Sequence, residues 1–472
     1  MGEWEKYAKQ YQTAWIDDLA GLVAIKSVRD DTQATPAHPY GPDVKAALDF
    51  MLQMAQRDGF TYGQFENKVG WIDFGPQDAK DFIGVLIHVD VVQVNDLPQW
   101  TVPPFELTNK NGLLYGRGVD DMKGSDILTY YALKAIAESG VALKRKIRLI
   151  IGTDEENEWG DMVDYFANNP KPVIGFSPDG VAQVANGEKG ISQLDVYFTP
   201  DNGVSAQQLL SFHSGAQTNI VPGEATAVVK GLTKPEAEAC LNTFVVANEL
   251  KDYIITEEVD DTLTINVSGK ATHASRPESG INAATHLAHF LLQYDFSGTA
   301  KQFLTFLGTN LYQDDFGEKS GYGYETPEMG KTTQNIGITD FELKGSGHIN
   351  FNFRYALGFD EPAVAQQIAD LPWVDRVDID PAGLVPHFVP ADDPVVTTLL
   401  TAYEDVLGHP TEHVVNGGAS FGRLLERGVG FGAWLVPELN TAHQADEHIP
   451  ISWFEPAFQF MAAGIVGLAN LE

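Results

Sequence analysis

The sequence predicts an α/β protein in which a discontinuous domain, built on a mainly parallel sheet covered by helices, carries an inserted α+β lid domain. The chain has 472 residues, which is too long for one ordinary hydrophobic core. Continuous apolar runs alternate with helical patterns in the first and last parts of the chain, whereas the strands of the middle part alternate polar and apolar residues. We therefore expect the split domain at residues 1–189 and 386–472 and the insert at 190–385.

The first part of the chain has the pattern of a parallel sheet with crossover helices. Helical periodicity occupies residues 13–60 and is interrupted by a loop around residues 36–42. Buried strands are expected at 81–88, 147–153 and 173–176, and helices at 126–139, ending at Gly140, and at 162–168. Continuous apolar strands separated by helices indicate a sheet that is covered on both faces.

From about residue 190 the strand pattern changes. The segments LDVYF, ATAVV, LTINV and HINFNF alternate in polarity, as expected of an antiparallel sheet with one solvated face. Helical stretches at 234–247, 282–292 and 363–369 lie between them. The last part of the chain returns to α/β character, with an apolar strand expected at 431–436.

Composition excludes several classes of partner. There are 65 acidic and 31 basic residues, a formal charge of −34, so we expect repulsion of nucleic acids and anionic membranes. The single cysteine, Cys240, permits no intramolecular disulfide and favours a reducing compartment. The stretch MGEWEKYAKQ is charged, and we expect no apolar run of the length needed to span a bilayer, so we expect a cytoplasmic protein with no secretory signal and no membrane partner.

Polar residues follow the predicted strands of the first and last parts. His88-Val89-Asp90 closes the first buried strand, Asp154-Glu155-Glu156 the second and Ser177-Pro178-Asp179 the third, and His443 follows the late strand. The glycine-rich turn GRGVDDMKG supplies Asp120 and Asp121 before a helix, without the glycine spacing of a phosphate-binding loop. Carboxyl ends of strands are where open α/β sheets bind ligands.

Each of these residues alone is commonplace, but the set matches one kind of chemistry. Two histidines and several carboxylates at one rim are the donor set of a dinuclear zinc hydrolase. Glu155 is available as a free carboxylate beside the metal ligands. Residues i and i+2 of an extended chain share a face, so Asp90 is placed to orient the His88 imidazole.

The ordered motifs H-x-D, G-R-G-x-x-D-x-K-G, E-E, S-P-D and H-x-x-(N/D)-E resemble those of the dinuclear zinc exopeptidases, the family of carnosinases, aminoacylases and desuccinylases. Within it the chain is most similar to the PepV-like dipeptidases, over essentially its whole length. The resemblance implies that two zinc ions, or Co²⁺ or Mn²⁺ as substitutes, are bound by five residues. The implied ligands are His88 and Asp179 for one ion, Glu156 and His443 for the other, and Asp121 as the bridge, with Asp120 as the second choice.

The resemblance also implies roles for other residues. Glu155 would be the catalytic base, and His273, in GKATHASRPESGIN, would polarise the scissile carbonyl. Asn219 and Arg354 match substrate-binding positions, Arg354 for the terminal carboxylate, and Ser420 lies in a loop that touches the same carboxylate. The chain departs from the family pattern at Asp446, where Asn is common, and at Ala419-Ser420, where Gly and Thr are more usual.

The expected function is hydrolysis of unblocked dipeptides. Two alternatives remain at this point: a deacylase or desuccinylase of N-acyl amino acids with the same metals, and a non-catalytic zinc-dependent binding protein. The insert is about twice as long as in relatives that pair through it, so the resemblance implies a monomer whose lid supplies His273 internally.

Overall fold

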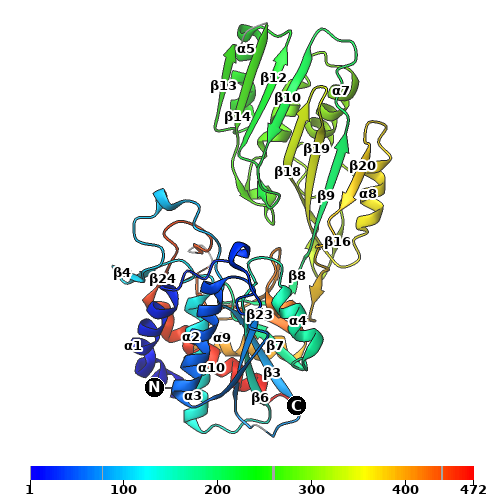
Figure 1. Cartoon of the computed structure of the whole chain (residues 1–472). Coiled ribbons are helices and arrows are strands. Elements are labelled where there is room, and N and C mark those ends of the chain that lie inside the picture. Colours follow the sequence, from blue (N-terminus) through cyan, green and yellow to red (C-terminus); the bar gives the residue numbers. More distant parts are fainter. Residues whose placement is uncertain (1, 77, 258–260, 437–439) are drawn as a thin grey trace. The chain divides into compact units, whose positions relative to one another are not determined.

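The computed structural model describes residues 2–76, 78–257, 261–436 and 440–472. The chain forms two compact units, one of residues Met1–Gly187 and Phe388–Glu472 (unit 1) and the other of residues Glu188–His387 (unit 2). Each has its own hydrophobic core, as expected of a chain of this length. Figure 1 shows the elements of both units along the chain.

Unit 1 contains a mixed sheet in the order β1-β2-β6-β3-β7-β23-β8-β21, with β22 paired to β8. Its strands are β1 (Thr61–Phe65), β2 (Val69–Phe74), β3 (Phe82–His88), β6 (Lys146–Gly152), β7 (Ile174–Ser177), β8 (Val184–Glu188), β21 (His387–Phe388), β22 (His413–Asn416) and β23 (Gly428–Phe431). The α/β class is confirmed. The four central strands β6, β3, β7 and β23 pair in parallel, whereas β2 pairs antiparallel with β6 and β8 pairs antiparallel with β23. All seven residues of β3 are buried, as a strand covered on both faces requires.

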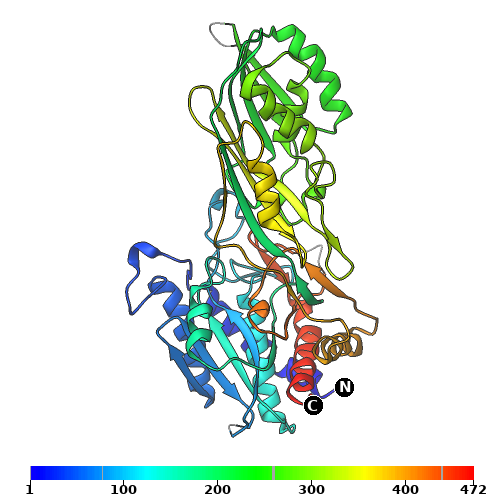
Figure 2. The ribbon, with the colours of Figure 1, turned by 90° about the vertical axis from the view of Figure 1, so that its right-hand side faces the viewer.

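Helices cover this sheet. They are α1 (Glu3–Val23), α2 (Pro42–Asp58), α3 (Lys123–Ser139), α4 (Gly160–Asn168), α9 (Pro394–Leu407) and α10 (Phe454–Ala469). Helices α3 and α10 pack on β3, and the first and last helices of the chain, α1 and α10, contact each other (Figure 2). Helix α3 ends at Gly140, whose left-handed backbone (φ 71°) suits a residue without a side chain. A small sheet of β4 (Thr108–Lys110), β5 (Leu113–Tyr115) and β24 (His448–Pro450) completes the unit.

Two expectations for the last part of the chain were wrong. The apolar segment expected as a strand at 431–436 is a strand only as far as Phe431. Residues 432–434 are buried in a loop, and Trp434 forms backbone hydrogen bonds with Gly180 and Ala182, so burial explains the apolar run.

The segment Ile451–Ala469 is long and apolar enough to cross a membrane, contrary to our expectation. Its α10 residues Phe454, Phe458 and Met461 are fully buried in the core of unit 1, which accounts for this composition.

Unit 2 is an α+β unit with an antiparallel eight-stranded sheet in the order β13-β14-β12-β10-β18-β19-β9-β20. The strands are β9 (Gly190–Phe198), β10 (Gln208–Ser214), β12 (Glu224–Lys230), β13 (Asp252–Glu257), β14 (Thr262–Ser268), β18 (Thr333–Glu342), β19 (Gly347–Tyr355) and β20 (Arg376–Ile379). Burial alternates along β9 and β14, as their sequence pattern predicts.

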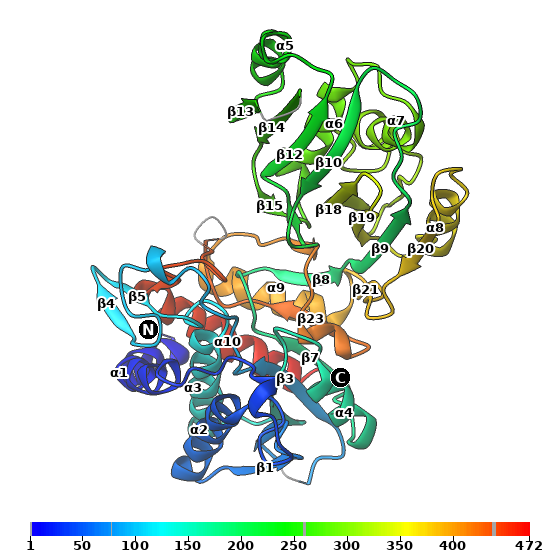
Figure 3. The same ribbon diagram turned by 45° about the horizontal axis from the view of Figure 1, so that its top comes forward.

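The helices of unit 2 are α5 (Lys234–Ala247), α6 (Ala283–Leu291), α7 (Gly298–Thr305) and α8 (Glu361–Ala369), and Figure 3 shows α6 behind β12 and β10. A capping box of Thr233 and Glu236 starts α5. Two short antiparallel strand pairs, β11 (Ile220–Val221) with β15 (Thr272–His273) and β16 (Glu325–Thr326) with β17 (Gly330–Lys331), lie outside the large sheet.

Candidate metal centre

Polar side chains lie at the carboxyl edge of the central strands of unit 1. His88 is the last residue of β3, Glu155 and Glu156 follow β6, and Asp179 follows β7. Both β6 and β7 pair with β3 in parallel, so the three strands end at the same edge of the sheet. Asp121 reaches this edge from the loop that precedes α3.

Three of these side chains, His88, Asp121 and Glu156, form a tight group with His443. The two carboxylate oxygens of Asp121 face the two histidines, at 3.2 Å from His88 Nε2 and 3.1 Å from His443 Nε2. His443 Nε2 is also 3.1 Å from Glu156 Oε2. Among the described residues, no hydrogen bond of acceptable geometry satisfies the buried atoms His88 Nε2, Asp121 Oδ1 and Glu156 Oε1, which is costly unless something else binds them.

The donor spacing fits a tetrahedral cation. Two ligand atoms at about 2.0–2.1 Å from a zinc ion lie roughly 3.3 Å from each other in a tetrahedral site. His88, Asp121 and Glu156 offer donor atoms that all lie within 4.8 Å of one another, and the His443 contacts join the same group. Glu155 Oε2 is 4.0 Å from His88 Nε2, beside the group.

The electrostatics of the site also favour a cation. Burial, together with the neighbouring carboxylates, raises the pKa of Glu155 well above its usual range and raises the pKa of Asp179 to about 8. Burial would lower the pKa of His443, but the carboxylates of Asp121 and Glu156 outweigh it and raise this pKa to about 11. A divalent cation would neutralise this concentration of buried negative charge. Asp179 is close enough to interact electrostatically with Asp121, His88 and Glu156.

Asp90 contacts the site through both its main chain and its side chain. His88 Nδ1 is 3.1 Å from the backbone carbonyl of Asp90 in hydrogen-bond geometry, whereas the Asp90 carboxylate lies 3.4 Å from Nδ1. That carboxylate accepts hydrogen bonds from the backbone N–H groups of Glu155 (3.2 Å) and Glu156 (3.1 Å). Asp90 therefore fixes the tautomer of His88 through its main chain and positions both glutamates through its side chain.

Asp120 and Asp121 have different surroundings. The Asp120 carboxylate accepts hydrogen bonds from the Thr441 N–H (2.7 Å) and, more weakly, from Thr441 Oγ1 (3.3 Å), while Asp121 faces the two histidines. Asp120 thus links the glycine-rich loop to the segment that carries His443. Asp446, where relatives commonly have Asn, accepts hydrogen bonds from the N–H (2.7 Å) and hydroxyl (2.8 Å) of Thr101.

Glu447 organises the glycine-rich loop, a role that the sequence did not reveal. Its carboxylate is fully buried and accepts hydrogen bonds from the N–H groups of Gly118 (2.9 Å), Asp120 (2.9 Å) and Asp121 (3.2 Å). It also pairs with the buried Arg117 at 2.6 Å. Arg117 lies in the glycine-rich motif, and Glu447 ends the motif that begins at His443. The presence of opposite charges next to the proposed ligands in these two motifs was the signal that could have predicted the pair.

Unit 2 brings together two of the residues expected to bind substrate. Ile220, next to Asn219, pairs with His273 between β11 and β15, and the Ala274 N–H donates to the Asn219 carbonyl at 2.8 Å. The side chains of Asn219 and His273 are both exposed. The Ser275 N–H donates to His273 Nδ1 at 3.2 Å, so the ring proton of the neutral imidazole is on Nε2, where it can be donated to a ligand.

Arg354 and Ser420 lie in different units. Arg354 is buried on β19, and its Nε donates to Asn352 Oδ1 at 3.0 Å, which holds the guanidinium in one orientation. Ser420 in unit 1 caps the 3-10 turn Phe421–Leu424. The ring of Phe421 contacts the His88 ring edge-on, with centroids 6.2 Å apart, so this loop borders the metal-ligand group.

Comparison with known proteins agrees with this geometry. A profile of the peptidase family M20/M25/M40 matches residues 84–466, which include every residue of the group. The chain belongs to this peptidase family. The expectation of a hydrolytic enzyme of the zinc exopeptidase type is thereby confirmed, since the family consists of peptidases.

Individual relatives cover nearly the whole chain. A protein of Staphylococcus aureus (strain USA300), provisionally named a dipeptidase, is 36% identical over 452 residues, covering 94% of this chain and 95% of that protein. Human carnosine dipeptidase 1 has the same fold, with a TM-score of 0.58 at 16% identity over 99% of this chain and 98% of that one. Aminoacylhistidine dipeptidase from Vibrio alginolyticus has a TM-score of 0.57 at 15% identity over 95% of each chain.

Proposed function

We propose that this M20-family peptidase is a dipeptidase that hydrolyses the peptide bond of unblocked dipeptides and uses two zinc ions. The observation that carries the proposal is the pair of histidines facing the two oxygens of Asp121 at 3.1–3.2 Å, with Glu155 beside them. The dipeptidase names of relatives that cover nearly the whole chain support the choice of substrate.

In this proposal His88 and Asp179 would hold one ion, Glu156 and His443 would hold the other, and Asp121 would serve both. When bound, the ions supply Lewis acidity, which polarises the scissile carbonyl and makes the attacking water more acidic. Co²⁺ or Mn²⁺ would suit the same nitrogen and oxygen donors. The hydrogen bonds from Asp90, Asp120 and Glu447 would keep the ligands in place.

Glu155 is the proposed general base. Its carboxylate is buried at the edge of the group, and its backbone N–H is held by Asp90. Glu155 would take a proton from the attacking water and deliver it to the leaving amine.

The substrate-binding roles fall mainly on unit 2. His273 would donate its Nε2–H to the oxyanion of the tetrahedral intermediate, an interaction that is typically worth about 3–4 kcal/mol. Arg354 would bind the C-terminal carboxylate of the substrate in a bidentate pair, assisted by Ser420, while Asn219 contacts the substrate backbone. Recognition of both ends of the substrate would limit it to one peptide bond.

A substrate panel tests this proposal. Zinc-reconstituted protein would be assayed with unblocked dipeptides, N-acetyl amino acids and N-succinyl-diaminopimelate. We expect turnover of dipeptides at least tenfold faster than that of either blocked class. Preference for a blocked class would instead make the protein a deacylase or desuccinylase, and absence of hydrolysis with two zinc ions bound would make it a binding protein.

We also propose that the enzyme is a cytoplasmic monomer. The single cysteine, Cys240, is exposed and suits a reducing compartment. Unit 2 spans Glu188–His387, a length that fits the doubled insert which the resemblance associates with monomers that supply His273 internally. Light scattering should give the monomer mass, and a dimer whose specific activity falls on dilution would contradict this.

A further inference from the structure

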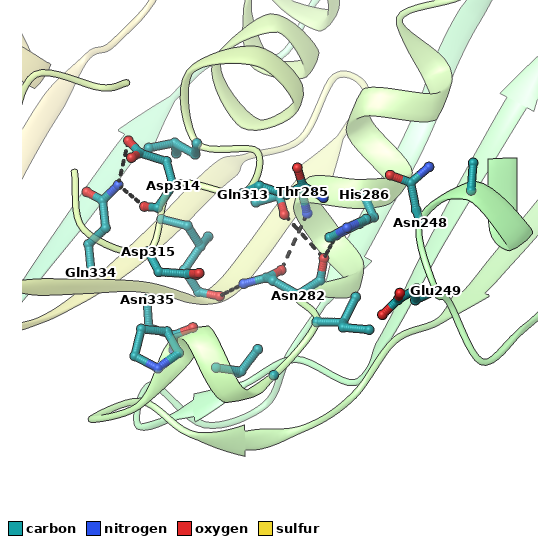
Figure 4. A pocket seen from close by; sticks show the side chains of 17 residues that line it. Asn248, Glu249, Asn282, Thr285, His286, Gln313, Asp314, Asp315, Gln334 and Asn335 are labelled. Carbon is teal, nitrogen blue, oxygen red and sulfur yellow. Dashed lines mark hydrogen bonds between the residues drawn. The ribbon is translucent and has the colours of Figure 1, made fainter. Parts of the chain in front are cut away.

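Unit 2 contains a cavity of about 290 Å³ that the proposed catalysis does not use. It is lined by the end of α5, the start of α6, the segment 313–315 and the first residues of β18 (Figure 4). Its polar lining includes Asn248, Glu249, His286 and Asp315, and no lysine or arginine lines it. The cavity is therefore acidic.

Asp315 is the first anomaly of this cavity. Its side chain is partly buried and has no hydrogen-bond or ion-pair partner among the residues that the structure describes. Burial and the nearby carboxylates of Glu278 and Asp314 raise its pKa to about 6, against the opposing effect of the Lys319 ammonium, which acts at a distance and forms no ion pair with it. The adjacent Asp314, by contrast, is satisfied by the N–H groups of Lys319 (3.1 Å) and Ser320 (2.8 Å). A carboxylate left without a partner in this way is stabilised by a cation that enters the cavity.

His286 is the second anomaly. The side chain is only 5% exposed, and its Nδ1 is 2.8 Å from the Asn282 carbonyl, so Nδ1 carries the proton. Burial lowers the pKa of this imidazole and keeps it neutral. Its Nε2 is then an acceptor, has no partner among the described residues, and belongs to a ring that lines the cavity. Figure 4 shows this ring between Asn248 and Asn282.

The donors that an anion would need are already used. At the start of α6, the Ala283 N–H donates to the Pro222 carbonyl, and the Ala284 and Thr285 N–H groups donate to Asn282 Oδ1. A bare metal ion fits poorly as well. Among the described residues, the group at His88, Asp121 and Glu156 is the one whose donor atoms are close enough together to hold a metal ion. The cavity thus offers acceptors spread over a volume suited to a small organic molecule.

We propose that this cavity binds a small aliphatic amine, whose ammonium group pairs with the Asp315 carboxylate, while His286 Nε2 offers a further acceptor in the same cavity. Figure 4 places Glu249 on the opposite side of the cavity from Asp315, which favours a molecule with a second ammonium group. Such a charge-assisted pair in a sheltered site is stronger than one on the surface. This site is separate from the proposed peptide hydrolysis, so either proposal can fail without the other.

The test is calorimetric titration of the zinc-loaded full-length protein with 1,4-diaminobutane and with n-butylamine. We expect saturable binding of both, with the diamine the tighter ligand, and at least tenfold weaker binding of both in Asp315→Asn. Glu249→Gln should reduce the affinity for the diamine to that of the monoamine. Asp295→Asn, an exposed carboxylate of the same unit outside the cavity, is the matched control and should bind like the parent protein.

Amide hydrogen exchange locates the binding site by a measurement that is independent of the calorimetric titration. The amine should slow exchange at residues 280–286 and 313–315 in the parent protein and not in Asp315→Asn, while dipeptide turnover without amine stays unchanged in both. Absence of saturable binding would overturn the proposal. It would equally be overturned by undiminished affinity in Asp315→Asn, or by Mg²⁺ or acetate binding there in preference to the amine.

Discussion

Replacement of Glu447 by glutamine perturbs the support of the metal centre without touching a ligand. Glutamine has the shape of glutamate but only one acceptor oxygen, and that oxygen is neutral. If it remains on the N–H groups of Gly118, Asp120 and Asp121, the NH₂ group faces Arg117, where two donors meet. Arg117 is 1% exposed, and Glu447 is its ion-pair partner in the described part of the chain.

The contacts set the size of the expected effects. Removal of one partner of a buried ion pair costs about 3–5 kcal/mol, because the other charge is left uncompensated. Three hydrogen bonds to an ionised acceptor become bonds to a neutral one, and each weakens by about 1 kcal/mol. Loss of the groups that orient metal ligands typically weakens metal binding by about 10–100-fold. We therefore expect Glu447→Gln to unfold at a lower temperature and to bind zinc about 10–100-fold more weakly.

A double variant separates the two effects. Adding Arg117→Met to Glu447→Gln removes the unpaired charge, so thermal stability should largely return. Zinc affinity, measured by competition with a chelator of known affinity, should stay weak because the loop N–H groups still lack the carboxylate. If zinc affinity returned together with stability, the idea that Glu447 positions Asp121 would be refuted.

Three further predictions concern single residues. Glu155→Gln should retain two zinc ions by elemental analysis and lose about 10²–10⁴-fold in kcat; unchanged turnover would remove it as the base. His273→Ala should lower kcat by about 10²–10³-fold with little change in KM, and a change confined to KM would indicate a binding role instead. Burial lowers the pKa of His213, but the carboxylates of Asp340 and Glu342 outweigh burial and raise this pKa. Protonated His213 therefore stabilises the fold fully at pH values below the unfolded-state pKa of about 6.5. The difference in melting temperature between the parent protein and His213→Gln should accordingly be largest below pH 6 and disappear as the pH rises through the raised pKa; a pH-independent difference would contradict this.

Features that depend on local pattern were predictable from the sequence. The fully apolar segment 82–88 is a buried central strand, and the alternation in 190–198 is a strand with one solvated face. The start of α5 and the end of α3 follow from a capping box and a glycine. The meeting of His88 and Glu156 at one edge follows from the parallel strands β3 and β6, whereas the place of Asp121 beside them, and the role of all three as ligands, came from the motif set.

Features that depend on long-range contacts were not predictable. The contact of Glu447 with Gly118 joins positions 329 residues apart, and no local pattern encodes it. The hydrogen bonds that the Asp90 carboxylate accepts from the Glu155 and Glu156 N–H groups likewise join segments 65 and 66 residues apart. The apolar run at 432–434 was misassigned because burial in a loop and burial in a strand produce the same composition.

The most direct test of a shared two-zinc centre is anomalous diffraction at the zinc edge from crystals grown with zinc. We predict two peaks about 3.5–4 Å apart. One should contact His88 and Asp179 and the other Glu156 and His443, with one oxygen of Asp121 on each and Glu155 bound to neither. A single peak, or two peaks of which Asp121 contacts only one, would contradict the proposed centre.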